Sequence, residues 1–289
     1  MTSYPQTIQV FLPDGDPSGL REAQITTRTV KVIDVPLLRL ASFRASLKSD
    51  RVAVYFLMGA DERSDECYIG QTNSAATRLG QHEKKDFVWQ RALVAYSLTD
   101  AWTIAHSQTI ERMAIERASR AGRYALANRT DGNKVHMQAP MEAECREYLD
   151  TIDVLLSTLA YPILKEPDTA ATSTDSDLLY LTESGCDAIA HRSTEGIVVH
   201  TGSRGREQTL DSAGPAVVKD RIRLISQKIL VAEEDSLIFT DDHAFASPSR
   251  AACVLTGRAT NGNKAWKTKS GRTLGELVDL DIRKSSGEE

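Results

Sequence analysis

The run Val52–Met58, with the sequence VAVYFLM, constrains the fold of this chain more than any other segment. Its β-branched and aromatic side chains favour an extended strand, and its unbroken apolar character indicates that the strand is buried. A helix that crosses a membrane needs about 20 apolar residues in a row, and the sequence has no stretch of about 18. The run therefore predicts a buried strand of a globular domain, and we expect no membrane partner.

Short elements of both kinds surround this strand. Alternating or β-rich patterns predict further strands over residues 7–12, 24–33, 67–70 and 87–96. Helix-favouring patterns predict helices over residues 36–47, 73–85, 109–126 and 141–159. Leu79 is the inward-facing residue of the second helix. The expected fold class is α+β, with a small antiparallel sheet flanked by helices.

The polar stretch EPDTAATSTDSD, at residues 166–177, predicts a linker between two parts of the chain. Beyond it we expect strands at 197–200 and 237–239 with a helix over 217–231 between them, which together make a second α+β module. The predicted domains are an N-terminal β extension at 1–50, a main domain at 51–165, the linker, an accessory module at 178–282 and a polar tail at 283–289.

Charge is distributed unevenly along the 289 residues, whose formal net charge is −5. Residues 142–183 carry ten acidic and two basic side chains, residues 112–129 carry five arginines and one acid, and residues 247–275 carry six basic side chains and no acid. An exposed charge acts over only about 8–10 Å at physiological salt, so local basic surfaces can contact phosphate on an acidic protein. The same surfaces are equally compatible with ordinary solvated charge.

The four cysteines, Cys67, Cys145, Cys186 and Cys253, form no CxxC pair and have no histidine at zinc-ligand spacing. A structural zinc site is therefore not expected. Residues 1–9 lack the basic and apolar segments of a secretion signal, so we expect a cytoplasmic protein with reduced thiols. The even number of cysteines leaves a disulfide open.

Two tyrosines and a helix form the first part of a candidate site. Tyr55 lies in the buried strand, and Tyr68 lies in the next strand, two residues before Gly70. A hairpin of the two strands can bring both phenols to one face. Arg78 and His82 are four residues apart and therefore share one face of the following helix.

An acid and an amide complete the set. Glu116, in the helix predicted over 109–126, supplies a hard oxygen ligand suited to Mg²⁺ or Mn²⁺, and one carboxylate suffices if phosphate oxygens and water complete the shell. Asn128 closes that helix. Each residue also has an ordinary explanation, since the tyrosines can be core aromatics and Glu116 can pair with Arg112 or Arg120 on the helix surface.

Taken in order, these residues resemble the signature of the GIY-YIG nuclease family: Ala53-Val54-Tyr55, Tyr68-Ile69-Gly70, Arg78-Leu79-Gly80-Gln81-His82, Glu116 and Asn128. The first glycine and isoleucine of that signature are Ala53 and Val54 here. The resemblance implies a three-stranded antiparallel sheet flanked by helices. It also implies a metal-dependent endonuclease that hydrolyses DNA phosphodiester bonds with one Mg²⁺ or Mn²⁺, at a site that Asn128 fixes by hydrogen bonds.

The resemblance further implies a role for each remaining residue. Glu116 would hold the metal ion, and Arg78 would bind the scissile phosphate and stabilise its developing charge. Tyr68 would take the proton from the attacking water, with Tyr55 and His82 supporting or sharing that task. A tyrosine has a pKa of about 10, so the assignment requires Arg78 or the metal ion close enough to lower it.

DNA is the partner that the resemblance implies. Candidate nucleic-acid contacts are Gly70, Lys84, Lys85 and Arg120 in the main domain and Lys264, Trp266 and Lys267 in the module. An aromatic side chain between two cations on one strand can stack on bases and contact phosphates. Trp266 is equally explained as the core aromatic of the module. Asn261-Gly262, just before it, predicts a hairpin turn.

The module also resembles a known domain. The similar segments are Ser247–Ala252, Gly257-Arg258, Asn261-Gly262, Lys264–Lys267 and Gly271–Leu274. They resemble a domain of unknown function that often follows GIY-YIG domains in bacterial proteins. That domain has no established activity, so the resemblance supplies none.

Two rival functions remain open beside the nuclease. One is a catalytically inactive nucleic-acid-binding protein on the same fold. The other is a regulatory protein that contacts a larger assembly through the acidic helix at 141–160. The sequence leaves the DNA target and the oligomeric state undetermined.

Overall fold

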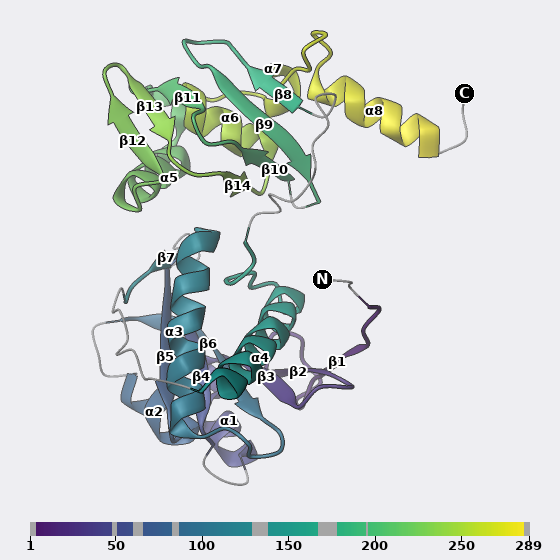
Figure 1. Cartoon of the computed structure of the whole chain (residues 1–289), viewed down its shortest axis with the longest axis vertical. Helices are drawn as coiled ribbons and strands as arrows, with labels where there is room; N and C mark the ends of the chain where they lie inside the picture. The colour runs from purple at the N-terminus through teal and green to yellow at the C-terminus, as the bar shows by residue number, and fades with distance from the viewer. Residues whose placement is uncertain are drawn as a thin grey trace. The chain divides into compact units, whose positions relative to one another are not determined.

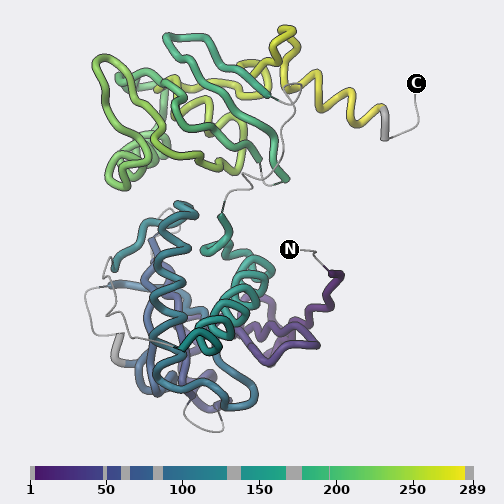
Figure 2. Tube along the Cα trace, viewed as in Figure 1, coloured from purple at the N-terminus to yellow at the C-terminus, as the bar shows by residue number. Residues whose placement is uncertain are grey.

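The computed structural model describes residues 4–47, 51–59, 66–82, 87–128, 138–166, 178–194 and 196–285. The chain divides into two compact units, residues 1–166 and 167–289. We describe each unit by itself, and both combine helices with antiparallel strands (Figures 1 and 2). The expected α+β fold class is therefore confirmed.

A seven-stranded sheet organises the first unit, with the strand order β1-β2-β3-β6-β4-β5-β7. The strands are β1 (Ile8–Phe11), β2 (Arg21–Ile25), β3 (Val30–Pro36), β4 (Ala53–Gly59), β5 (Glu66–Thr72), β6 (Trp89–Ser97) and β7 (Ala125–Leu126). Neighbouring strands are antiparallel except for β7, which runs parallel to β5. The sheet is therefore larger than the three-stranded sheet that the resemblance implies, although it contains three adjacent antiparallel strands, β6, β4 and β5.

The apolar run at 52–58 forms β4, which is buried on both faces. Val54 and Phe56 belong to the core cluster built with α3 (Ile104–Ala121) and α4 (Ala139–Thr158) (Figure 1). The alternate residues Tyr55 and Leu57 belong to the cluster on the opposite face. Strand side chains alternate between faces, so a strand between two helix layers needs no polar residue.

The opposite face is covered by α1 (Leu40–Ser46), which follows the 3₁₀ turn η1 (Leu37–Arg39), and by α2 (Ala75–His82). Leu79 of α2 is fully buried, as the sequence pattern predicted. The predicted apolar stripe of α4, made of Leu149, Ile152, Leu156 and Leu159, is likewise buried. Amphipathic spacing was therefore a reliable guide to which side of each helix faces the sheet.

Three boundaries differ from the prediction. Residues 24–33 form the end of β2, a turn and the start of β3, because a hairpin reverses the chain there. β3 pairs with β6, so the N-terminal strands extend the same sheet. The helix predicted over 109–126 runs over Ile104–Ala121: the Thr103 N–H donates to His106 Nδ1 at its start, and Gly122 adopts a φ of 62° at its end.

Two smaller sheets form the second unit. The four-stranded sheet has the order β14-β10-β9-β8, and the three-stranded sheet has the order β11-β13-β12. The strands are β8 (Leu178–Leu181), β9 (Ala188–Ser193), β10 (Gly196–Val199), β11 (Arg204–Arg206), β12 (Leu230–Glu233), β13 (Ser236–Phe239) and β14 (His243–Phe245). The helical elements are η2 (Asp211–Ala213), α5 (Pro215–Ser226), α6 (Pro248–Thr256), α7 (Gly262–Ala265) and α8 (Leu274–Ser285).

The helix predicted over 217–231 ends at Ser226, and its last predicted residues belong to β12. The predicted hairpin turn at Asn261-Gly262 is wrong, because these residues begin the short helix α7. A Cβ on Gly262 would lie 2.2 Å from the carbonyl carbon of Pro248. Glycine is therefore required there for the close approach of two backbone segments.

One buried arginine of the second unit donates hydrogen bonds to several separate segments of that unit. Arg221 of α5 is 3% exposed and has no ion pair among the residues that the structure describes. Its Nε donates to Val254 O at 2.8 Å, and its two terminal nitrogens donate to four more oxygens: Glu207 O, Thr209 Oγ1, Arg206 O and Leu255 O. The guanidinium thus cross-links the start of the unit's second sheet to α5 and α6.

In the part of the chain that the structure describes, we find no helix with the length and apolarity needed to span a lipid bilayer.

Candidate active site

The two phenols meet on the face of the sheet that α2 covers. Tyr55 of β4 lies opposite Gly70 of β5, and Tyr68 lies two residues earlier on the same face of β5. The two ring centroids are 6.2 Å apart and the ring planes differ by 19°. Tyr55 is 1% exposed, whereas Tyr68 is only partly buried. The hairpin therefore brings the tyrosines together as the sequence predicted.

Position 70 requires a glycine because the Tyr55 ring packs against its backbone. A Cβ at position 70 would lie 2.5 Å from both the Cζ and the hydroxyl oxygen of Tyr55, so the phenol lies against the Gly70 backbone. Gly70 is buried beneath that ring and is not a surface contact for a nucleic acid, contrary to the prediction. Its function is to leave room for the neighbouring phenol.

Arg78 links α2 to the phenols. Its Nε donates a hydrogen bond to the Tyr55 hydroxyl at 3.3 Å. Hydrogen bonding to Tyr55, opposed by partial burial, raises the pKa of Arg78 above its usual value. Burial raises the pKa of Tyr55 to about 12, although the bond from Arg78 works against this shift. Tyr55 is consequently a neutral phenol at physiological pH, and Tyr68 is the more exposed ring of the pair.

The acid that faces this cluster is Glu111, which the sequence reasoning missed. Glu111 lies on α3, and its carboxylate is stabilised by the backbone N–H of Gln71 and by the charge of Arg78. Its negative charge in turn acts on Tyr55. Burial is the dominant influence and raises the pKa of Glu111 above its ordinary value. Glu111 is thus a half-buried carboxylate that interacts electrostatically with Arg78 and Tyr55.

Glu116, the acid predicted for that position, points elsewhere. Five residues of α-helix correspond to a rotation of about 500°, so Glu116 projects roughly 140° away from Glu111 around α3. Its side chain is 53% exposed and pairs with Arg112, one turn earlier, at 2.8 Å. The surface pair that the sequence allowed as the ordinary explanation of Glu116 is what forms, and the metal-ligand assignment to Glu116 stays a prediction that this geometry does not favour.

The sequence contains a pattern that could have identified Glu111. Ile104, Ser107 and Glu111 are spaced three and four residues apart, so they form one stripe of α3. Ser107 Oγ lies 3.3 Å from Gln71 Oε1, which fixes this stripe against β5. Recognising Thr103 as the helix start would have moved the helix toward the N-terminus and placed Glu111 in its interior.

Asn128 lies beyond α3 and beyond β7, and does not close the helix as predicted. Its Nδ2 donates to Ile69 O at 2.5 Å, and its Oδ1 accepts from the Ile69 N–H at 3.1 Å. Asn128 thereby holds the β5 backbone between Tyr68 and Gly70. The predicted role, fixing the site by hydrogen bonds, agrees with this geometry.

The other predicted site and phosphate-contact residues of the first unit have different outcomes. Lys84 and Lys85 lie outside the described residues, and His82 is described only as the last residue of α2. Arg120 forms an ion pair with Glu166 at 2.9 Å. Another arginine of α3, Arg117, pairs with Asp150 and Asp153 of α4. The basic segment at 112–129 therefore meets part of the acidic segment within the unit, which reduces its capacity to bind phosphate.

Trp266 in the second unit is a core residue. It is fully buried, and its Nε1 donates to Pro248 O at 3.0 Å. Lys264 and Lys267 are exposed on either side of it. A buried indole cannot stack on a nucleobase, so the prediction of an aromatic DNA contact is wrong while the two lysines remain available to solvent.

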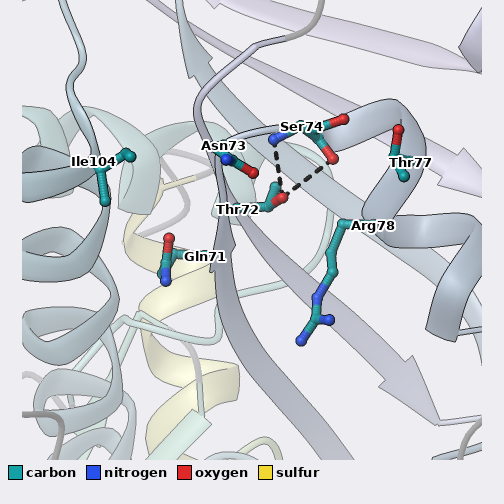
Figure 3. A pocket seen from close by; sticks show the side chains of 7 residues that line it. All are labelled: Gln71, Thr72, Asn73, Ser74, Thr77, Arg78 and Ile104. Carbon is teal, nitrogen blue, oxygen red and sulfur yellow. Dashed lines mark hydrogen bonds between the residues drawn. The ribbon is translucent and has the colours of Figure 1, made fainter.

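A cavity of about 370 Å³ adjoins the cluster (Figure 3). It is lined by the segment Gln71–Ser74, which ends β5 and turns toward α2, by Thr77 and Arg78 of α2, and by Ile104 of α3. The turn is ordered by its own hydrogen bonds, because Thr72 Oγ1 donates to Ser74 O at 3.1 Å and accepts from the Ser74 N–H at 3.0 Å. Arg78 therefore borders both the phenols and an open hollow.

A metal ion at this site would have one protein carboxylate ligand, that of Glu111. Among the described residues, no three His, Cys, Asp or Glu side chains come together in a group able to hold a metal ion. One divalent ion still fits Glu111, because a cation favours the ionised carboxylate and so offsets the cost of its burial. The remaining positions of such an ion would belong to phosphate oxygens and water.

The comparisons with known proteins concern the second unit alone. Residues 179–278 match the family described as a domain of unknown function (DUF4357). This match confirms the resemblance of the module. No GIY-YIG family model matches, so that resemblance stays a prediction for the first unit. Neither a curated protein nor a solved structure matches the chain.

Proposed function

We propose that the first unit is a metal-dependent endonuclease that hydrolyses DNA phosphodiester bonds. One observation carries the proposal: Tyr55, Tyr68 and Arg78 meet on one face of the sheet beside an open cavity, and Glu111 of α3 interacts electrostatically with Arg78 and Tyr55. Phosphoryl transfer requires a cation against the phosphate, a proton acceptor for the water and a place for a metal ion. DNA as the substrate, one Mg²⁺ or Mn²⁺ and a cytoplasmic location are parts of this proposal.

Each residue has a role that follows from its surroundings. Arg78 is fixed by Tyr55 and presents its charge to a phosphate, where it stabilises the negative charge that develops. Tyr68, whose ring is only partly buried, would accept the proton of the attacking water as its phenolate, with Arg78 and the metal ion beside it to balance the negative charge. The neutral Tyr55 orients Arg78. Glu111 holds the metal ion, which, when bound, polarises the phosphoryl group and stabilises the leaving oxygen.

Two glutamates on the same helix provide a matched test. Glu111→Gln removes one charge without changing side-chain size, and we expect it to lower the cleavage rate by at least about 10³-fold. Glu116→Gln makes the same change on the other side of α3 and should leave cleavage within about twofold of the unmodified protein. The measurement is Mg²⁺- or Mn²⁺-dependent nicking of plasmid and branched DNA, with EDTA as the blank.

The outcomes separate the proposal from its rivals. Full activity of Glu111→Gln would reject Glu111 as the ligand, and a larger loss in Glu116→Gln would make Glu116 the ligand instead. If the unmodified protein binds DNA but cleaves no form of it in either metal, the first unit is a binding protein and the endonuclease proposal is overturned. If it neither binds nor cleaves DNA, the regulatory rival is the one to pursue.

A further inference from the structure

The cavity next to Arg78 has a lining that suits a nucleoside. It combines the neutral polar side chains of the segment Gln71–Ser74 and of Thr77 with one cation, Arg78, and one aliphatic side chain, Ile104 (Figure 3). Ile104 is 50% exposed although it is strongly apolar. No carboxylate is among the described residues that line the cavity. A ligand that fits this lining has an anionic end, hydrogen-bonding edges and an apolar face.

The cavity and the site share residues of β5, α2 and α3. Ile104 and Glu111 are separated by seven residues of one helical stripe, which corresponds to about 10 Å along the axis. Gln71 lies between them, since its side chain lines the cavity and its backbone N–H stabilises Glu111. Arg78 is common to both places. A ligand strand with a phosphate at Arg78 therefore directs its neighbouring nucleoside into the cavity.

We propose that this cavity binds the sugar and base of the nucleotide next to the cleaved phosphate, and that this nucleotide must be unpaired to enter. The inference rests on the proposed function and specifies its substrate class. A volume of about 370 Å³ lies near the small end of ligand sites, which suits one nucleoside and not a base pair. A base leaves a duplex only at a cost of a few kcal/mol, which a bulge or a single strand avoids.

Specific side chains carry the recognition. The Ile104 side chain contacts the face of the sugar or base, since an exposed aliphatic group gains by being covered. Asn73 and Thr77 are exposed at the rim and offer hydrogen bonds to base edges. Gln71, fixed by Ser107, is a preorganised partner for the same purpose. Thr72 and Ser74 bond to each other and shape the wall.

The experiment compares three DNAs of one sequence with the full chain. They are a perfect duplex, the same duplex with a one-nucleotide bulge, and that bulge with an abasic sugar in place of the extra nucleotide. Binding is measured by fluorescence anisotropy in Ca²⁺, and cleavage is measured separately in Mg²⁺ or Mn²⁺. We expect the bulge to bind roughly tenfold more tightly than the duplex, and the abasic bulge to lose most of that preference.

Ile104→Ala should remove most of the preference for the bulge while leaving duplex binding unchanged. The matched control is Ile225→Ala in the second unit, a residue of similar exposure (46%), which should keep the full preference. Thermal unfolding of both variants checks that each folds. Asn73→Ala supplies a second variant on the cavity rim, with a smaller expected loss.

The proposal is overturned if the abasic bulge binds as tightly as the intact bulge, or if Ile104→Ala and Ile225→Ala behave alike. Because binding is read without cleavage, this result is independent of the nuclease test. A loss of preference in Ile104→Ala with no cleavage by any form would keep the nucleotide site and reject the endonuclease. Cleavage that depends on Glu111 but ignores the bulge would reject only the nucleotide site.

Discussion

The two units use a partly or wholly buried arginine in opposite ways. Arg221 in the second unit gives its guanidinium donors to five protein oxygens, four of them backbone carbonyls. Arg78 in the first unit donates to a phenol that is itself a candidate site residue and borders an open cavity. The first arrangement stabilises the fold, because every donor is satisfied by the protein. The second keeps a cation beside space that a ligand can occupy.

The same contrast applies to the large aromatic side chains. Trp266 and Tyr55 are both almost completely buried, and each makes a hydrogen bond with its polar atom. The indole of Trp266 bonds to a carbonyl within the core, whereas the phenol of Tyr55 bonds to the arginine at the cavity. Burial alone therefore does not separate core residues from site residues, and the partner of the polar atom does.

The largest effect is expected for Arg221→Met, which keeps the apolar stem and removes all five hydrogen bonds. Leaving buried carbonyls without partners should lower the free energy of unfolding of the second unit by on the order of 4 kcal/mol. Hydrogen–deuterium exchange of the α5 and α6 amides measures this loss of stability. Arg221→Lys keeps the positive charge but lacks the planar guanidinium, so it tests whether the charge alone stabilises the unit. Unchanged exchange in Arg221→Met would remove the basis for calling this arginine structural.

Arg78→Ala is the counterpart in the first unit. We expect the cleavage rate to fall by about 10²–10³-fold, because one donor to the phosphate is lost. The free energy of unfolding of the first unit should fall by less than that of the second unit in Arg221→Met, because one hydrogen bond and not five is lost. Arg120→Ala, which breaks a surface ion pair with Glu166, is the matched control and should cleave normally. If Arg78→Ala lowered stability strongly and still cleaved DNA normally, Arg78 would be a structural arginine like Arg221, and the contrast between them would be wrong.

Gly70→Ala tests how tightly the phenol is held. The added methyl group meets the Tyr55 ring at 2.5 Å, so we expect a loss of about 1–3 kcal/mol in the free energy of unfolding and reduced cleavage. Gly275→Ala adds a methyl group that meets nothing closer than 3.4 Å and is the control. Combining Gly70→Ala with Tyr55→Leu should restore stability without restoring activity. Full activity of Gly70→Ala would show that the position of Tyr55 is unimportant.

The smallest effect is a gain in stability. Because burial raises the pKa of Glu111 in the folded protein above its ordinary value, ionisation of Glu111 weakens the metal-free fold as pH rises through that raised pKa. Glu111→Gln should therefore raise the Tm at pH 7 by about 2 °C and have no effect below the ordinary value of 4.5. Added Mg²⁺ or Mn²⁺ should stabilise the unmodified protein more than the variant. Equal stabilisation of both would place the ion elsewhere.

Local patterns in the sequence predicted most elements of the first unit. The hairpin of β4 and β5 followed from its apolar strand and short connection, and with it the meeting of Tyr55 and Tyr68. The buried Leu79 followed from helical spacing. These features depend on residues close together in sequence, for which strand alternation and helical periodicity are direct geometric rules.

The acid could not be placed by the same reasoning. Both Glu111 and Glu116 lie on α3, and choosing between them requires the rotation of the helix relative to β5. That rotation depends on contacts such as Ser107 with Gln71, which join residues far apart in the chain. The burial of Trp266 beneath α6 and α7 is a long-range feature of the same kind, since its partner Pro248 lies eighteen residues earlier.

The outer edge of β5 has a further consequence. β7 covers only Glu66 and Cys67, after which the Asn128 amide takes both backbone groups of Ile69 and Glu111 takes the N–H of Gln71. An open strand edge invites pairing with other polypeptides, and these two side chains occupy the groups that such pairing needs. Side chains thus satisfy the backbone groups of Ile69 and Gln71 that a further strand would otherwise need for pairing.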